Sequence, residues 1–326
     1  MTPRERVLAA LAGRPVDRVP VSLWLHNFAT ENSAEDLAAE TLRLARRFGW
    51  DFLKPQSRAQ CFAEMWGLRY TPSREQAVPY TVTHAPFSTA DDLRTLKPVD
   101  ARSGALGEQL RALREIRRAV ELDTPVIWTV FSPLMVLPFL LKGGRAQAVE
   151  VMRSDPDALD HALEAMAVTL AGYAAAAVAD GADGLFYATN MATRELSTAP
   201  ECRRFQRPHD LRILKAVESA PFNLLHVCGE GVLFDEFVDY PATALSWATV
   251  PGNPSLTEGH RRTGRAVVGG LPAKPTIAGL LPSEVEARGR QAVAEMNGRF
   301  LLLGPDCSIN PDTPEAVMDA ARAAVT

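Results

Sequence analysis

The stretch "DPDALDHALEAMAVTLAGYAAAAVADGADGLFYAT" (residues 155–189) decides the fold, because it joins a long helix directly to a short apolar strand. Asp155 is a suitable N-cap, and Pro156 fits the first helical position. Helical periodicity continues to Gly181, which closes the helix. Residues 184–189 are then continuously apolar, as expected of a parallel strand that is covered on both faces.

The same alternation of strand and helix recurs along the chain. The predicted strands are residues 19–24, 51–55, 125–131, 184–189, 222–227, 244–249, 265–271 and 299–304. Eight such alternations predict an α/β fold, a single (β/α)₈ TIM barrel that spans residues 1–326 as one domain. Residues 56–103 break the pattern, so we expect an irregular insertion after the second strand, with a β-hairpin or similar excursion near the barrel mouth. A doubly wound open sheet is the rival fold, but no glycine-rich phosphate loop follows the first strand.

Composition excludes several other classes of protein. Net charge is −4 with no run of five like charges, which argues against a nucleic-acid partner. No run of about 18 apolar residues and no signal-like N-terminal segment is present, so we expect a cytoplasmic protein without a membrane span. Four cysteines in such a chain favour metal binding or catalysis over a disulfide framework.

Catalytic groups of a barrel sit at the carboxyl ends of its strands. His226 and Cys228 end the fifth strand in "LLHVCGE" (224–230), and Cys307 follows the eighth in "GPDCSINPDTP" (304–314). One histidine and two thiolates form a three-ligand zinc set with an open fourth position. Packing is the alternative, because free cysteine is often buried. The two strands are not neighbours, so their loops must bring the sulfurs together.

Other strand ends supply further candidates. Lys54 ends the second strand and is left without a role. The predicted catalytic residues are His26, Tyr187 and Asn190, and the predicted substrate-binding residues are Trp24, Asn27, Phe186 and Asp306. His26 could be a fourth metal ligand, a general base or a substrate contact, and we favour substrate contact. The alternatives are a structural role for His26, barrel core for the two aromatic residues, and orientation of the metal ligands for Asp306.

Several segments, in this order, resemble the uroporphyrinogen decarboxylase superfamily. They are "TPRERVLAALAGRPVDRVPV" (2–21), "VFSPLMVLPFLLKG" (130–143), "ADGADGLFYAT" (179–189), "LLHVCGE" and "LLGPDCSINPDTPEAVMDAARAAV" (302–325). The resemblance implies a (β/α)₈ barrel. One branch decarboxylates uroporphyrinogen without a cofactor. The other contains corrinoid-linked methyltransferases, which carry zinc on a His-x-Cys pair and a distant cysteine, and His226, Cys228 and Cys307 match that pattern.

The chain departs from the decarboxylase branch at two places. That branch has an arginine-rich R-Q-A-G-R-Y segment after the first strand, whereas "LHNFATENS" (25–33) contains no arginine. Its glycine-histidine-glycine near the eighth strand is replaced by "GPDCS". A substrate with eight carboxylates would therefore lack its cationic clamps, and decarboxylation of uroporphyrinogen is not expected.

The resemblance therefore implies a zinc-dependent methyltransferase. It would move a methyl group between a corrinoid, or a methylated small molecule, and a thiol or related acceptor. Zinc is the expected cofactor, cobalamin a candidate methyl carrier, and a corrinoid protein a candidate partner. Two alternatives stay open: a cofactorless lyase that uses His26 as acid or base on a small carboxylate, and a barrel that only binds a tetrapyrrole or corrinoid.

Overall fold

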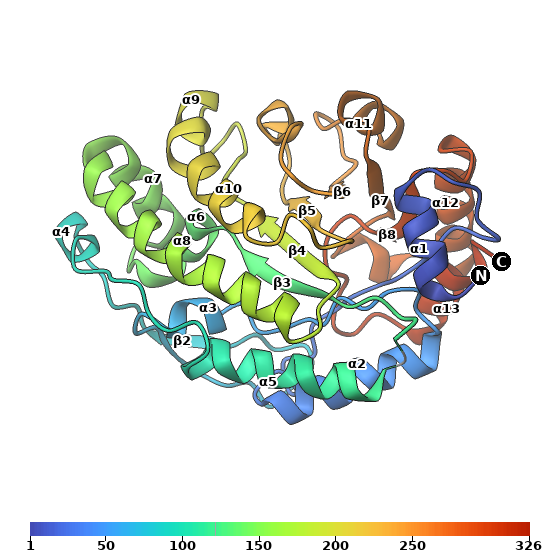
Figure 1. Cartoon of the computed structure of the whole chain (residues 1–326), viewed down its shortest axis with the longest axis horizontal. Helices are drawn as coiled ribbons and strands as arrows, with labels where there is room; N and C mark the ends of the chain where they lie inside the picture. The colour runs from blue at the N-terminus through green and yellow to red at the C-terminus, as the bar shows by residue number, and fades with distance from the viewer. Residues whose placement is uncertain (121) are drawn as a thin grey trace.

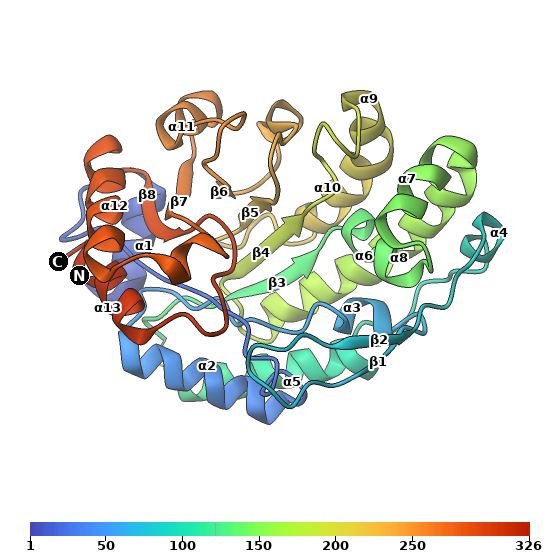
Figure 2. The same ribbon diagram turned by 180° about the vertical axis from the view of Figure 1, so that it is seen from behind.

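The computed structural model describes residues 1–120 and 122–326, and its centre is a six-stranded parallel sheet. The strands neighbour one another in chain order: β3 (Ile127–Phe131), β4 (Gly184–Thr189), β5 (Leu224–Val227), β6 (Ala244–Trp247), β7 (Ala266–Leu271) and β8 (Leu301–Pro305). Helices surround the strands, as Figures 1 and 2 show from opposite sides. The predicted α/β barrel class is confirmed.

The first two predicted strands are present only as short extended segments between β8 and β3. Val21 pairs in parallel with Leu303 of β8, and Leu53 pairs in parallel with Val126, just ahead of β3. The Asp51 N–H donates to the Val21 carbonyl oxygen over 2.9 Å, which joins the two segments to each other. Backbone contacts therefore run from β8 through these two segments to β3, in the order that the sequence predicts.

These two segments are shorter than predicted because a side chain replaces part of the backbone ladder. Pro20 has no N–H to donate, and the Val21 N–H donates to Oδ2 of Asp51 over 2.9 Å instead of to a carbonyl. Asp51 is fully buried and forms ion pairs with Arg6 at 2.6 Å and Arg18 at 2.5 Å. A buried carboxylate with two guanidinium partners thus takes the place of further strand pairing at this seam.

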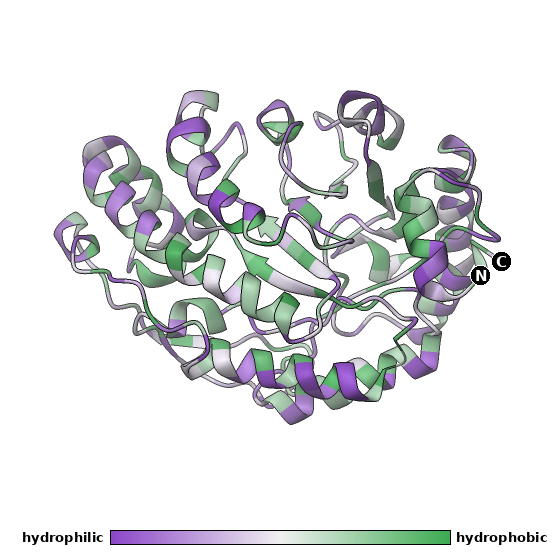
Figure 3. Ribbon diagram, viewed as in Figure 1, coloured by the Kyte–Doolittle hydropathy of each residue, from purple (hydrophilic) through white to green (hydrophobic). Residues whose placement is uncertain are grey.

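The helices lie outside the sheet, and both termini lie close together in both views (Figures 1 and 2). The longer helices are α1 (Pro3–Leu11), α2 (Ala34–Phe48), α5 (Gly104–Ala119), α6 (Pro133–Leu140), α7 (Gly144–Ser154), α8 (Pro156–Ala179), α10 (Arg207–Lys215), α11 (Leu256–Thr263), α12 (Pro282–Glu295) and α13 (Glu315–Ala323). Shorter pieces are α3 (Cys61–Glu64), α4 (Ala90–Leu93) and α9 (Ala199–Glu201), and a π-helical turn, Cys202–Gln206, leads into α10. Figure 3 shows hydrophobic and hydrophilic residues alternating along the outer helices, as amphipathic cover for a buried sheet requires.

Helix α8 begins as its sequence predicts. The Asp155 carboxylate accepts the Ala158 N–H over 3.2 Å, and Pro156 occupies the first turn. The helix ends at Ala179, and Gly181 follows with φ of +109°, a conformation that favours glycine. By length and composition, α8 is the one described helix that would suit a membrane span. Of its apolar 18-residue stretch, however, 61% is buried within the fold. A core helix of a soluble protein has the same pattern.

The predicted insertion follows the second segment. It contains α3, the antiparallel pair β1 (Arg69–Thr71) and β2 (Thr81–His84), and α4. It contacts the loop after the first segment, because the Phe28 N–H donates to the Gln76 carbonyl over 3.1 Å and the Phe28 and Tyr80 rings meet edge to face at 5.6 Å. The hairpin is therefore confirmed, and it covers the loop that carries His26.

Aromatic side chains fill the space enclosed by the strands. Trp24 lies 6.4 Å from Phe52 and 5.5 Å from Phe186 between ring centroids, and Phe52 meets Phe222 at 5.2 Å. These four residues are at most 4% exposed. We call these four residues the aromatic floor. They fill the barrel interior beneath the carboxyl ends of the strands, as expected for a packed core rather than a channel.

Candidate metal centre

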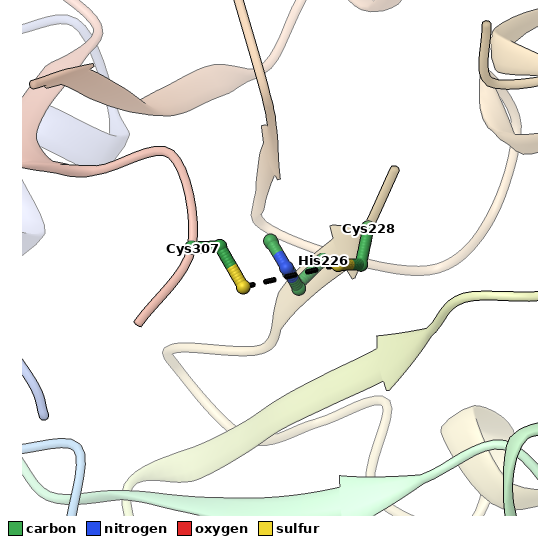
Figure 4. Close-up of side chains that lie close together, drawn as sticks. All are labelled: His226, Cys228 and Cys307. Atoms are coloured by element: carbon green, nitrogen blue, oxygen red, sulfur yellow. Dashed lines mark hydrogen bonds between the residues drawn. The ribbon is translucent and has the colours of Figure 1, made fainter. Parts of the chain in front are cut away.

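Three side chains converge at the carboxyl ends of β5 and β8. His226 belongs to β5, Cys228 follows it, and Cys307 follows β8. Figure 4 shows the Cys228 and Cys307 sulfurs joined by a dashed line, with the His226 imidazole beside them. The Sγ atoms of Cys228 and Cys307 lie 3.8 Å apart, and the three potential ligand atoms all lie within 4.8 Å of one another. The loops therefore bring together residues from two strands that are not neighbours.

The backbone after β5 places Cys228 toward this group. The Cys228 N–H donates to the Thr189 carbonyl over 2.8 Å, which continues the pairing with β4 for one more residue. Gly229 then takes φ of +122°, and a Cβ there would lie only 2.8 Å from the Thr193 side chain. Glycine thus lets the chain turn away while the thiol stays at the strand end.

His226 presents one free ring nitrogen to the sulfurs. Its Nδ1 lies 3.2 Å from the Ser246 hydroxyl of β6, and Phe186 stacks on its ring at 5.2 Å. Nε2 is buried and has no hydrogen-bond partner among the described residues. A buried ring nitrogen without a partner is unfavourable unless a ligand occupies it. Ser246 at Nδ1 is the kind of partner that fixes the orientation of a metal-binding imidazole.

The pKa values of the two thiols shift in opposite directions because the thiols share one hydrogen bond. The Cys228 thiol, with His226 close by, holds the pKa of Cys307 well below its usual range. The same hydrogen bond, and burial, raise the pKa of Cys228. Burial also raises the pKa of Cys202 to about 12 and that of Cys61 still further above its usual value. Cys307 is therefore the thiol most ready to become a thiolate, the form that binds metals.

The spacing of the sulfurs fits a tetrahedral zinc ion. Two zinc–sulfur bonds of about 2.3 Å at a tetrahedral angle place the sulfurs about 3.8 Å apart, and the observed separation is 3.8 Å. The donor set also suits zinc, because thiolates and imidazole favour it over magnesium or calcium. Three ligands from the chain would leave a fourth position on such an ion for water or substrate, and both cysteines are half-buried at the strand ends.

Asp306 ties the loop that carries Cys307 to a neighbouring loop. Its Oδ2 accepts the Thr249 N–H over 2.8 Å and the Thr249 hydroxyl over 2.9 Å. Its own N–H donates to the Leu271 carbonyl, and burial raises the pKa of its carboxyl. These contacts agree with the alternative that Asp306 orients the metal ligands. Its Oδ1 has no partner among the described residues, so a substrate contact stays a prediction.

His26 faces a hydrogen-bond network instead of the two sulfurs. Its Nδ1 lies 2.8 Å from the Glu31 carboxylate, and its Nε2 lies 2.8 Å from Nε2 of Gln56. The carboxylate must accept from Nδ1–H, so Nε2 accepts from the Gln56 amide. With both ring nitrogens engaged in this way, the geometry disfavours His26 as a fourth metal ligand.

Lys54 joins this network and is the strand-end candidate to which the sequence analysis assigned no role. Its ammonium donates to Oε1 of Gln56 and lies 4.5 Å from the centroid of the Phe186 ring. Only 7% of the residue is exposed, and burial lowers its pKa to about 7. Phe186 therefore contacts both Lys54 and His226. The available signal was a lysine within an apolar strand, where charged side chains are rare.

Three predicted substrate-binding residues and Asn190, which was predicted to be catalytic, differ in what their side chains contact. Trp24 lies in the aromatic floor, whereas Phe186 forms the wall between the lysine and the imidazole. The Asn27 amide donates to Glu40 of α2 over 3.3 Å, so the partner that the structure gives it lies on an outer helix. Asn190 follows β4, is half-buried, and its Oδ1 has no partner among the described residues, which leaves it able to contact a ligand.

Tyr187 does not reach the metal centre. Its neighbour Phe186 faces the barrel interior, and successive strand residues face opposite sides, so Tyr187 faces the outer helices. Its hydroxyl donates to Oδ1 of Asp210 on α10 over 2.5 Å, and the residue is fully buried. Gln206 donates to the same carboxylate over 3.0 Å. The contacts that the structure gives Tyr187 are those of a structural residue, and its predicted catalytic role has no geometric support.

Replacement of Tyr187 by phenylalanine should lower stability and spare turnover. The lost hydrogen bond to a buried carboxylate is worth about 1.5–3 kcal/mol. Burial raises the pKa of Asp210 to about 6, and hydrogen bonds from Tyr187 and Gln206 oppose that rise. The variant should raise this folded-state pKa further, so its loss of stability should be larger at pH 7.5 than at pH 5. Denaturant unfolding at both pH values is the measurement, and a variant of normal stability but no activity would restore the catalytic role.

Comparison with known proteins agrees with this geometry. The family model for Uroporphyrinogen decarboxylase (URO-D) matches residues 2–326. The chain is 25% identical to the methylated-thiol–coenzyme M methyltransferase of Methanosarcina mazei over 342 residues, which cover 96% of this chain and 86% of the relative. It is 24% identical to the methylcobamide:CoM methyltransferase MtaA of Methanosarcina barkeri over 331 residues, with coverage of 96% and 94%.

A solved structure of a methyltransferase from Methanosarcina mazei has the same fold. It superposes with a TM-score of 0.82 at 22% identity and covers 99% of this chain and 98% of its own. The overlap extends over the whole barrel, including the strand ends that carry His226, Cys228 and Cys307. The chain thus belongs to the uroporphyrinogen decarboxylase (URO-D) family.

Proposed function

We propose that the protein is a zinc-dependent methyltransferase that transfers a methyl group between a corrinoid and a small thiol. The observation that carries the proposal is the arrangement of His226, Cys228 and Cys307, whose sulfurs have the separation of two ligands on one tetrahedral zinc ion. The relatives named above are methyltransferases, and their names specify thiol and methylcobamide substrates. A corrinoid protein is accordingly the proposed macromolecular partner.

The chain's own residues would hold zinc and shape its surroundings. His226 supplies Nε2, Ser246 fixes the ring, and Cys228 and Cys307 supply two thiolates. Zinc held by these residues would lower the pKa of a substrate thiol and so supply a nucleophile at neutral pH. The two thiolates balance the charge of the ion, so a substrate thiolate would add one negative charge to a neutral centre. Phe186, one of the floor residues, stacks on the His226 ring and shields that ligand from water.

The alternative functions receive less support from the contacts. A lyase that uses His26 as acid or base needs a ring nitrogen directed at the substrate, and both ring nitrogens are hydrogen-bonded to Glu31 and Gln56. A barrel that only binds a corrinoid needs no three-ligand set with an open position. Arg58, the first arginine after the second segment, is committed to Glu64 and Glu108, so it is not a free clamp for carboxylates.

Thiol-dependent demethylation of methylcobalamin is the expected activity. Purified protein loaded with zinc should convert methylcobalamin in the presence of 2-mercaptoethanesulfonate, and the change in the corrinoid's visible spectrum measures the rate. Protein stripped with a chelator should lose that rate and regain it when zinc is added. In parallel, uroporphyrinogen should stay intact, as chromatography of its oxidised products would report. A four-carboxylate porphyrin product without methyl transfer would reverse the proposal in favour of the lyase.

A further inference from the structure

The two cysteines of the candidate metal centre follow strands that are not neighbours. Two other strands, β6 and β7, separate β5 from β8 in the sheet. A functional site needs its groups held within about 0.5 Å of the working geometry, so other contacts must fix the distance between Cys228 and Cys307. Residues 246–254, the end of β6 and the loop after it, supply contacts on both sides. We call these residues the β6 segment.

Asn253 of the β6 segment holds the loop that carries Cys228. Its Nδ2 donates to the Gly229 carbonyl over 3.0 Å and to the Ala248 carbonyl over 2.9 Å, and its Oδ1 accepts the Val232 N–H over 2.9 Å. An asparagine amide has two N–H donors and one carbonyl oxygen, so all three are engaged with backbone groups. Gly229 directly follows Cys228. The side chain therefore anchors this loop at two points and braces the β6 segment itself.

Thr249 of the same segment holds the loop that carries Cys307. Its N–H and its hydroxyl both donate to Oδ2 of Asp306, over 2.8 Å and 2.9 Å. Asp306 directly precedes Cys307 in the chain. Hydrogen bonds to a carboxylate are stronger than those between neutral groups. The loops after β6 and β8 are thus linked next to the second cysteine, as the loops after β6 and β5 are linked next to the first.

The remaining ligand, His226, also contacts the β6 segment. Ser246 lies opposite His226 in the parallel pairing of β5 with β6, and its hydroxyl lies 3.2 Å from Nδ1 of the imidazole. Trp247 is 1% exposed, and its Nε1–H donates to the Pro254 carbonyl over 2.8 Å. This buried anchor fixes the far end of the segment. One braced segment therefore contacts His226 and a residue next to each cysteine.

We propose that the β6 segment sets the distance between the two sulfurs of the metal centre, and that Asn253 and Thr249 are its positioning residues. Asn253 acts on the loop after β5, and Thr249 acts on the loop after β8. This inference rests on the proposed zinc site and extends it beyond the ligands. A change in the segment should alter the separation of the sulfurs while every ligand is still present.

Zinc affinity, measured by competition with a coloured chelator, tests the proposal. Asn253→Leu removes three hydrogen bonds at similar size and should weaken zinc binding by about 10- to 100-fold, the usual effect of losing a partner outside the ligand set. Thr249→Val should weaken it by only about 3-fold, because the N–H bond to Asp306 remains. Thr249→Ser keeps the hydroxyl and should bind zinc as the wild type does. In cobalt-loaded Asn253→Leu, the visible d–d bands should shift as the ligand geometry relaxes.

Asn223→Leu is the matched control. Asn223 lies just ahead of β5, where its Oδ1 accepts the Leu185 N–H over 3.0 Å and its Nδ2 donates to the Val217 carbonyl over 2.8 Å. It makes the same kind of backbone contacts as Asn253, but at the opposite end of the strand. Asn223→Leu should therefore lower the denaturant midpoint of the metal-free protein at least as much as Asn253→Leu and leave zinc affinity unchanged. Equal zinc affinity in the two variants would overturn the proposal.

A second readout does not depend on zinc. Dibromobimane crosslinks neighbouring thiols, and mass spectrometry of the digested, metal-free protein identifies the crosslink between Cys228 and Cys307. This crosslink should form at the same rate in the wild type and in Asn223→Leu, and more slowly in Asn253→Leu. If the wild type binds no zinc and its crosslinking still depends on Asn253, the proposed function fails and the positioning role stands. If zinc does not bind and all three proteins crosslink at one rate, the positioning role is wrong as well.

Discussion

Replacement of Cys307 by serine should remove most of the bound zinc and, with it, methyl transfer. Structural zinc sites bind with about 10–16 kcal/mol, so one thiolate among three or four ligands contributes about 3–4 kcal/mol, or 10²- to 10³-fold in affinity. Cys307 is also the thiol whose pKa is lowered, so serine removes the ligand that is most readily ionised. Elemental analysis of protein dialysed against a weak chelator measures the loss.

A matched control makes this result specific. Cys202 is buried near α10, and burial raises its pKa, so Cys202→Ala should keep its full zinc content. Replacement of zinc by cobalt gives a second readout, because the sulfur-to-cobalt absorption should fall by about half in Cys228→Ser or Cys307→Ser and stay intact in Cys202→Ala. Full retention of zinc by both Cys228→Ser and Cys307→Ser would show that the ligand set is wrong.

Replacement of His26 by alanine should leave zinc in place and lower turnover by about 10- to 100-fold. The reason is indirect: His26 holds Gln56, which in turn holds the Lys54 ammonium above Phe186. Alanine leaves Glu31 without the imidazole partner and frees it to attract Lys54 away from the metal centre. His26 thus positions the Lys54 ammonium and does not itself reach the reacting atoms.

The pattern of the kinetic defect separates positioning from a general structural role. If His26 positions the ammonium, His26→Ala should raise KM for an anionic thiol more than for a neutral one of the same length. Loss of metal in the variant would instead identify His26 as a ligand, and unchanged turnover would make it a structural residue. Zinc content and the two KM values should be measured on the same preparation.

The sequence predicted the barrel and the convergence of the metal-centre residues because both follow from strand order. His226 and Cys307 lie at the carboxyl ends of β5 and β8, and every parallel strand of a barrel ends at the same face. What the sequence could not supply was the direction of side chains within that face. A shift of one residue reverses direction, which is why Phe186 lies inside while Tyr187 lies against α10.

Lys54 and the two shortened strands were harder to foresee for another reason. Burial of Lys54, and the absence of a carboxylate beside it, depend on loops that meet only in three dimensions. Likewise, the carboxylate of Asp51 accepts the Val21 N–H that an ordinary ladder would give to a carbonyl, and no local pattern indicates this exchange. Such exchanges involve contacts between distant parts of the chain, whereas periodicity reports only local order.

The pairing of Val21 with Leu303 also has a consequence for how the protein is made. Val21 leaves the ribosome well before its pairing partner, Leu303 of β8, has been translated. Until β8 emerges, the apolar edge at the N-terminal seam has only one neighbour and is exposed to other nascent chains. Contacts between such distant positions slow folding. This seam therefore closes only after β8 has been made.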